Sequence, residues 1–210
     1  MTRRGTLQTA KRLKRLIVLV AFLYICSYLV GWYLIGLKSP VAVQFSEEAS
    51  QAVLTEQPFR LIIQSLREGD LVKAILITFL VNLTIGAFLT TTLPGILPVI
   101  GALGIIATTL VRGFTIGVTY PEVLSSSPAA FVLGFGTLIL ELGAYVFSGA
   151  AGINIALAPV SPRKFGVESR WAAFKIAWRD AARIFVIVVI LLASGAVWEM
   201  TLMFSMLRAT

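Results

Sequence analysis

The stretch AAFVLGFGTLILELGAYVFSGAAGINIAL, residues 129–157, decides the fold class. It is long enough to cross a bilayer as a helix, since about 20 apolar residues suffice. Glu141 is its only charged residue. A carboxylate at the centre of a membrane helix costs at least about 2.5 kcal/mol. The sequence therefore predicts a membrane helix whose carboxylate faces a partner inside the protein.

The composition of the whole chain agrees with this interpretation. Of 210 residues, 58% are hydrophobic and 13% are charged, and the mean hydropathy is +0.90. Soluble domains carry about 25% charged residues. Lipid cannot satisfy the backbone of an open strand, and the continuous apolar runs argue against a barrel, whose strands alternate. We predict an all-α polytopic transmembrane helix bundle, with residues 1–210 as a single domain.

We expect five spans, with the N-terminus in the cytoplasm and the C-terminus outside. The expected spans cover residues about 16–37, 71–93, 99–120, 129–157 and 184–207. Six cations precede the first span and six lie in the segment 158–183, whereas the segment 38–70 has five acids, Glu56 among them, against three cations. Cytoplasmic segments are enriched in Lys and Arg. The net charge of +8 therefore reflects membrane orientation and not nucleic-acid binding. The first apolar run is too long for a signal peptide and should stay as an anchor.

Two stretches outside the spans have amphipathic helical patterns. In QPFRLIIQSLRE, apolar residues recur at helical spacing, which indicates a helix on the outer surface. In ESRWAAFKIAWRDAAR, three aromatic residues and a lysine suit an anionic inner leaflet. They are Trp171, Phe174, Lys175 and Trp178. Each stretch either anchors the protein at the membrane surface or is a docking surface for a partner.

A polar set lies within the predicted spans. It comprises Asn82, Arg112, Glu141, Asn154 and Glu199. At about 1.5 Å per residue, Arg112 and Glu199 share one level in the outer half of the bilayer. Because a lone buried charge costs more than a hydrogen-bonded pair, we predict that Arg112 pairs with Glu199, Glu141 or both. A second predicted contact joins Asn82 to Glu141. Three interpretations remain open: the polar set holds the bundle together, it lines a path or gate, or desolvation keeps Glu141 as a neutral acid.

Small residues indicate where the spans approach each other closely. The third span carries Thr109, Gly113 and Gly117 at intervals of four residues. The fourth carries Ala144, Ser148, Gly149 and Gly152. Such stripes allow helix backbones to meet in membranes. We therefore expect these faces to be helix contacts.

Side-chain chemistry for catalysis is scarce in this sequence. There are no histidines, and the single cysteine, Cys26, lies inside the first span. Histidine-based catalytic pairs, histidine metal helices and an intramolecular disulfide are therefore excluded. No GxxxxGK[ST] phosphate loop and no GxSxG motif occurs. We expect no enzymatic activity, no cofactor and no metal ion.

The sequence resembles the stage II sporulation protein M family of five-span membrane proteins. The resemblance runs from about Phe79 to Thr201 and includes FLVNLTIGAFL, RGFTIGV, ILELGAYVFSGAAGINIA and GAVWEM. It implies that Asn82, Glu141, Gly149, Gly152 and Glu199 occupy family motif positions. Two departures stand out: Thr137 and Leu138 replace a frequent His-Gly, and Arg112 replaces the Asn of a frequent Asn-Gly in the third span.

The resemblance implies a membrane partner for other envelope proteins. In endospore-forming bacteria the family's namesake is implied to act in forespore engulfment beside peptidoglycan-degrading proteins, and related members occur in organisms that do not sporulate. We expect a multi-pass cell-membrane protein in contact with the lipid bilayer and with protein partners, or a homo-oligomer. We expect it to act as a non-enzymatic scaffold or assembly partner whose docking faces are segments 38–70 and 158–183. The alternative is a permease-like transporter subunit with a polar path and a separate ATPase.

Overall fold

A computed structural model describes residues 3–55 and 57–209, and Glu56, one of the acids counted above, falls outside them. The described chain is helical without a strand, and it has five helical segments long and apolar enough to span a membrane. These observations confirm the all-α prediction and the number of spans. The elements are α1 (Arg3–Arg12), α2 (Lys14–Gly36), α3 (Pro40–Thr55), α4 (Phe59–Arg67), α5 (Leu71–Val81), η1 (Asn82–Leu89), η2 (Leu93–Ile96), α6 (Ile100–Ser126), α7 (Pro128–Leu157), η3 (Pro162–Phe165) and α8 (Arg170–Ala209).

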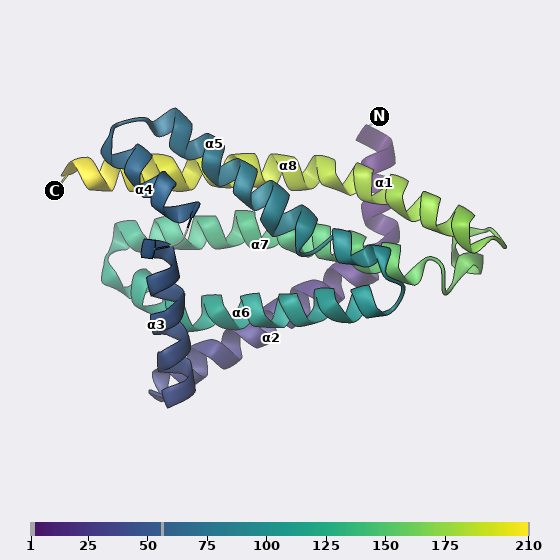
Figure 1. Ribbon diagram of the computed structural model, residues 1–210, viewed down its shortest axis with the longest axis horizontal. Helices are drawn as coiled ribbons and strands as arrows, with labels where there is room; N and C mark the ends of the chain where they lie inside the picture. Colours follow the sequence, from purple (N-terminus) through teal and green to yellow (C-terminus); the bar gives the residue numbers. More distant parts are fainter. Residues whose placement is uncertain (1–2, 56, 210) are drawn as a thin grey trace.

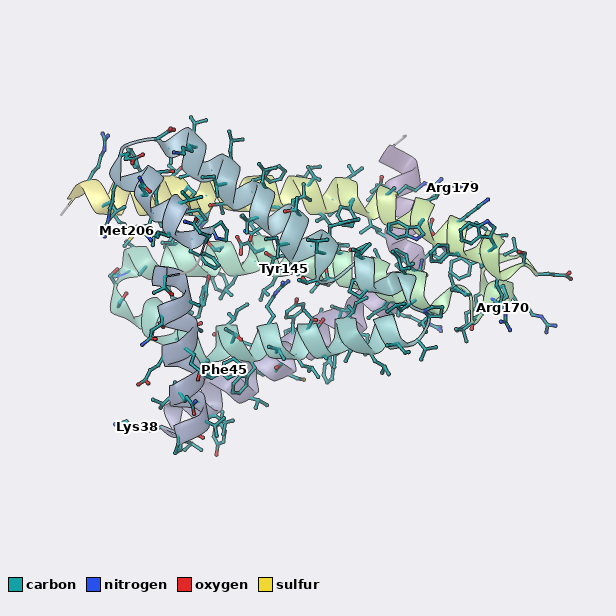
Figure 2. The ribbon with its side chains drawn as sticks, in the orientation of Figure 1. Lys38, Phe45, Tyr145, Arg170, Arg179 and Met206 are labelled. Carbon is teal, nitrogen blue, oxygen red and sulfur yellow. The ribbon has the colours of Figure 1, made fainter. Side chains whose placement is uncertain are left out.

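The spanning helices pack as two long pairs with a fifth helix beside them. α2 runs along α6, α7 runs along α8, and α5 lies against α8 (Figure 1). α3 crosses one end of the bundle, and α1 packs against α8 towards the other end. The C-terminus lies at the end that carries α3 and α4, away from η3 (Figure 1). Figure 2 shows Lys38, Phe45 and Met206 towards that end, and Arg170 and Arg179 towards the opposite one.

Local sequence signals explain where two of these helices begin. The Asp70 carboxylate accepts a hydrogen bond from the Lys73 backbone N–H at 3.0 Å and caps α5. Ser127 has an extended backbone, and its hydroxyl accepts from the Ala130 N–H at 3.1 Å to cap α7. Side-chain caps of this kind satisfy N–H groups that have no partner within the helix. The caps therefore fix the start of two of the spans that carry the polar set.

The second span is an irregular helix. α5 passes directly into η1, a π-helix that begins at Asn82, and the short 3₁₀ turn η2 leads to α6. π-helical segments are rare and are frequent at functional sites. Gly86 within η1 leaves room for an aromatic ring, since a Cβ there would lie 2.7 Å from the Tyr145 hydroxyl. The irregular segment is thus fitted against α7.

Glycines bring α2 and α6 into backbone contact. A Cβ added at Gly113 would lie 2.9 Å from the Tyr24 carbonyl oxygen, and one at Gly117 would lie 2.2 Å from that of Tyr28. From the opposite helix, a Cβ at Gly31 would lie 2.6 Å from the Phe114 carbonyl oxygen. The small residues of the third span therefore face α2.

Ser148 and Gly152 of α7 face the turn between η1 and α6, and Gly149 faces α2. A Cβ at Gly152 would lie 2.1 Å from the Thr91 carbonyl oxygen. The hydroxyls of Thr91 and Ser148 lie 2.7 Å apart, and Thr92 donates to the Ser148 carbonyl at 3.2 Å. Ala144 is fully buried. A Cβ at Gly149 would lie 3.3 Å from Val20 of α2.

The last span differs from its predicted extent. The sequence separates an amphipathic stretch within 158–183 from a span at 184–207, whereas the structure joins most of both in the 40-residue helix α8. The change from apolar to charged residues marks where lipid contact ends, but it does not interrupt backbone hydrogen bonding, and no proline stands in the way. A 40-residue helix is about 60 Å long, twice the roughly 30 Å of a hydrocarbon core. Part of α8 therefore extends beyond the length that a bilayer needs.

The amphipathic stretch near residue 60 forms a helix, α4, as predicted, but the apolar face that we expected at the outer membrane surface packs against protein. Its apolar face is occupied by protein, because Ile62 and Leu66 are buried in a cluster with Ala74 of α5 and Met200 of α8. Phe59 remains 40% exposed. The helix thereby covers one end of the space between α5 and α8.

Candidate functional site

A cavity of about 280 Å³ lies beneath α4 and brings most of the predicted polar set together. Its polar lining comes from α5, η1, α6, α7 and α8, and Phe59, Ile62 and Ile63 of α4 line it as well. The polar residues are Thr78, Asn82, Tyr120, Glu141 and Glu199. Two carboxylates thus face one small space between the spans.

Asn82 and Glu141 are in direct contact across this cavity. The Asn82 side-chain amide donates a hydrogen bond of 2.5 Å to Glu141 Oε1. This is the second contact predicted from the sequence. Thr78 lies one turn before Asn82 and is buried, and its hydroxyl has no hydrogen-bond partner. Because buried polar groups are almost always paired, this hydroxyl is an unsatisfied hydrogen-bonding group next to the two carboxyl groups.

Arg112 does not form the ion pair that the sequence predicts. No carboxylate of the described residues lies within salt-bridge distance of its guanidinium. Instead, Arg112 donates to the Gly86 carbonyl at 3.3 Å and to the Thr90 hydroxyl at 3.1 Å. Its guanidinium carbon lies 4.1 Å from the centre of the Tyr145 ring. The prediction of a direct ion pair between Arg112 and Glu141 or Glu199 is therefore wrong.

The geometry of η1 explains this difference. Gly86 is within the last four residues of η1, where carbonyl groups carry partial negative charge, and its carbonyl accepts from the Thr90 hydroxyl at 2.7 Å as well as from Arg112. A cation can satisfy such a carbonyl and stack on an aromatic face at the same time. Figure 2 shows Tyr145 in the space between α7 and α6, and the Arg112 guanidinium lies over its ring. Arg112 is stabilised without a carboxylate.

Sequence reasoning missed three residues of this region. Thr78 precedes Asn82 by four residues, and Tyr145 follows Glu141 by four, so each shares a helical face with a predicted residue. This four-residue spacing could have identified both residues from the sequence. Tyr120 lies at the end of the predicted third span, and its inward direction has no comparable signal in the sequence.

A second charged cluster lies towards the opposite end of α8. Asp180 is fully buried and forms an ion pair with Arg12 of α1 and a longer one of 3.5 Å with Arg183. This cluster was not predicted. The sequence feature that could have predicted it is the single acid in WRDAAR, because a carboxylate between cationic residues tends to form an ion pair. The pairing ties α1 to α8.

The predicted aromatic stripe forms an exposed groove of about 440 Å³ on α8. Trp171 and Phe174 stack with ring centres 5.4 Å apart, and Phe174 meets Trp178 edge-on at 6.3 Å. The Lys175 ammonium lies 5.3 Å from the centre of the Trp171 ring. The other face of this stretch is buried, with Ala173 and Ala177 in the core. The helix therefore presents one free aromatic and cationic face.

These sites offer side-chain groups that can bind a ligand or a partner. The cavity at Glu141 offers carboxylate, amide and hydroxyl oxygens, which accept from cations and from hydrogen-bond donors. Among the described residues, no three His, Cys, Asp or Glu side chains form a group that could hold a metal ion. The groove on α8 offers flat apolar rings beside positive charge.

The fold and the sites define a polytopic membrane protein built as a helix bundle with a polar interior cavity. Comparison with family models gives a match to stage II sporulation protein M over residues 18–202. The chain belongs to this family, as the sequence motifs indicated. Comparison with curated proteins gives no match, and comparison with solved structures gives none.

Proposed function

We propose that the protein is a non-enzymatic membrane scaffold or assembly partner for other envelope proteins, and that segment 170–183 of α8 is its main docking face. The observation that carries this proposal is the free aromatic and cationic face of that segment. The segment continues a membrane-spanning helix, and α1 and the Arg12–Asp180 ion pair brace it from the other side. A rigid helix with exposed Trp and Arg side chains has the composition of interaction hot spots.

We further propose that the N-terminus and segment 158–183 lie in the cytoplasm, with segment 38–70 and the C-terminus outside. The distribution of Lys and Arg supports this orientation. Labelling with a membrane-impermeant thiol reagent tests it in intact cells, in a Cys26→Ala background. Lys175→Cys should be protected and Glu47→Cys should react. The reverse pattern would contradict the orientation.

The absence of enzymatic activity is part of the same proposal. The chain has no histidine and one cysteine, within a span. The ionisable side chains that line the cavity are Tyr120, Glu141 and Glu199, and no serine or cysteine stands among the lining residues. The oxygens of this cavity suit ligand binding or helix packing.

A docking role predicts crosslinks at defined positions of α8. A photoreactive amino acid at Trp171 or Lys175 should give a crosslinked product of discrete mass in native membranes. The same probe at Ile190, which is 60% exposed on the apolar part of α8, is the control. Replacing both Trp171 and Trp178 with Ala should abolish the Lys175 product while the protein remains in the membrane. Equal products at Lys175 and Ile190, or no product at Lys175, would refute the docking face.

The cavity at Glu141 favours a second candidate, a permease-like subunit with a separate ATPase. Two carboxylates and an unpaired hydroxyl in one space between spans are the features expected of a polar path. Arg112 lies outside this cavity, however, and the small residues of α7 pack tightly against the turn after η1. Identification of an ATPase in the Lys175 crosslink, together with loss of a transport phenotype in Glu141→Gln, would decide for this candidate.

A further inference from the structure

A second cavity of about 280 Å³ lies where α1 meets α2, next to the end of α7 and to the connection that leads to α8. Its polar lining includes Arg12, Arg15 and Lys164, and its apolar walls include Leu13 and Phe165. The volume is just below the roughly 300 Å³ at which small-molecule sites begin. None of the functions considered above uses this cavity.

The electrostatics of the cavity favour an anion. Three cations line it and no acid does. Arg12 is held by Asp180, whereas the described residues provide no ion pair for Arg15 or Lys164. Two positive charges at the cavity are therefore free to meet a ligand.

Asn154 supplies an independent observation that points to a ligand. It lines the cavity from α7 and is only 8% exposed. Its side-chain amide nitrogen is buried and has no hydrogen-bond partner. Since buried N–H groups are almost always satisfied, an acceptor that the protein does not provide is expected beside it. Oxygen atoms of an anion would supply this acceptor.

We propose that this cavity binds a phosphate-bearing anion, of the kind that a phospholipid headgroup or free phosphate presents. Arg15 and Lys164 balance the negative charge of the phosphate, and the Asn154 side-chain amide donates a hydrogen bond to one of the phosphate oxygens. Hydrogen bonds between cationic side chains and phosphate oxygens are among the strong ones in proteins. Leu13 and Phe165 line the same space, and basic pockets between membrane helices recognise lipid headgroups. These walls favour the lipid as the source of the phosphate.

A diffuse attraction of basic residues to an anionic leaflet is the competing explanation, and one pair of neighbours separates the two. Lys14 and Arg15 are adjacent and exposed, and both lie at the start of α2, but only Arg15 lines the cavity. Lys14→Gln and Arg15→Gln remove the same charge from the same part of the chain. If the cavity is a specific site, only Arg15→Gln weakens binding of the anion.

The test is native mass spectrometry of the purified full chain, delipidated in detergent and titrated with dioleoylphosphatidylglycerol. Dioleoylglycerol, which has the same acyl chains without phosphate, is the control lipid. Arg15→Gln and Asn154→Asp should each weaken phosphatidylglycerol binding about tenfold, since each disturbs a charge-assisted contact. Lys14→Gln should change it less than about twofold. Asn154→Leu removes the unpaired amide without adding charge, so it should fold and should also bind more weakly.

A second arm identifies the source of the phosphate. If inorganic phosphate raises the thermal stability of the wild type but not of Arg15→Gln, while both lipids bind alike, the site takes free phosphate and the proposed chemistry holds. If Lys14→Gln and Arg15→Gln weaken lipid binding equally, or if both Asn154 variants bind like the wild type, the proposal is overturned.

Discussion

Gly117→Ala provides a sharp test of how the bundle is held together. At this position a Cβ would lie 2.2 Å from the Tyr28 carbonyl oxygen and 3.1 Å from the Cα of Gly31. Both neighbours are backbone atoms of α2, so no side-chain rotation can relieve the contact. Ordinary contacts of a Cβ begin at 3.4 Å. The two helices must therefore separate by about 1 Å, which loosens the packing along their interface.

The size of the effect follows from this displacement. Forcing an extra methyl group into a packed interior typically destabilises a protein by about 1–3 kcal/mol. In a chain of this length each kcal/mol lowers the melting temperature by roughly 2–4 °C. Gly104 is the matched control, because it lies in the same helix and has nothing within 4 Å of the added Cβ. Gly104→Ala should be neutral or stabilising by up to about 1 kcal/mol, the usual gain from removing a helical glycine.

The assay is thermal denaturation of both variants and the wild type in one detergent, followed by tryptophan fluorescence. We expect the melting temperature of Gly104→Ala to be equal to or above that of the wild type, and that of Gly117→Ala to be below it. Equal melting temperatures for the two variants would refute the close contact of α2 and α6. If Gly104→Ala were destabilised and Gly117→Ala were not, the face of α6 that contacts α2 would be the one that carries Gly104, which contradicts the structure.

Three further predictions concern the charged and polar residues. Glu141→Leu should lower stability by about 1–3 kcal/mol because it leaves the Asn82 amide unpaired, whereas Glu141→Gln keeps an acceptor and should cost less in the same assay. Arg112→Met and Glu141→Gln should have additive effects in a double-mutant cycle, because the two side chains do not form an ion pair. A coupling energy above about 0.5 kcal/mol would contradict this. Arg12→Gln should destabilise the protein by about 1–3 kcal/mol because it deprives the buried Asp180 of its closer partner, and a wild-type melting temperature would contradict this.

The sequence was sufficient for the features that depend on one-dimensional patterns. Continuous apolar runs located five spans, because hydrocarbon selects composition directly. Spacing by four residues identified Gly113 and Gly117 as contact residues, because that interval keeps side chains on one helical face. The Asn82–Glu141 contact followed from similar depth in the membrane. Each of these inferences needs only the period and the rise of a helix.

The features that were missed depend on rotation about the helix axis and on irregular backbone. Helical rise predicts matching depths for Arg112 and Glu199, but depth does not show which way a side chain points, and Arg112 points to η1 and Tyr145. No pattern in the sequence announces the π-helix that supplies its carbonyl partner. The continuous helix α8 was divided in the prediction because a change in polarity was taken as a change in secondary structure.

The irregular second span explains how Glu141 and Arg112 each find a hydrogen-bond partner without a direct ion pair between them. Asn82, at the start of η1, donates to Glu141. Gly86, in its last turn, accepts from Arg112. One eight-residue segment therefore binds a carboxyl group at one end and a guanidinium at the other, and the two side chains form no direct ion pair. The consequence is that Glu141 faces the cavity with a single neutral hydrogen bond and retains capacity to accept further donors. A regular α-helix would place the Gly86 carbonyl in its own hydrogen-bond ladder, and Arg112 would then depend on a carboxylate.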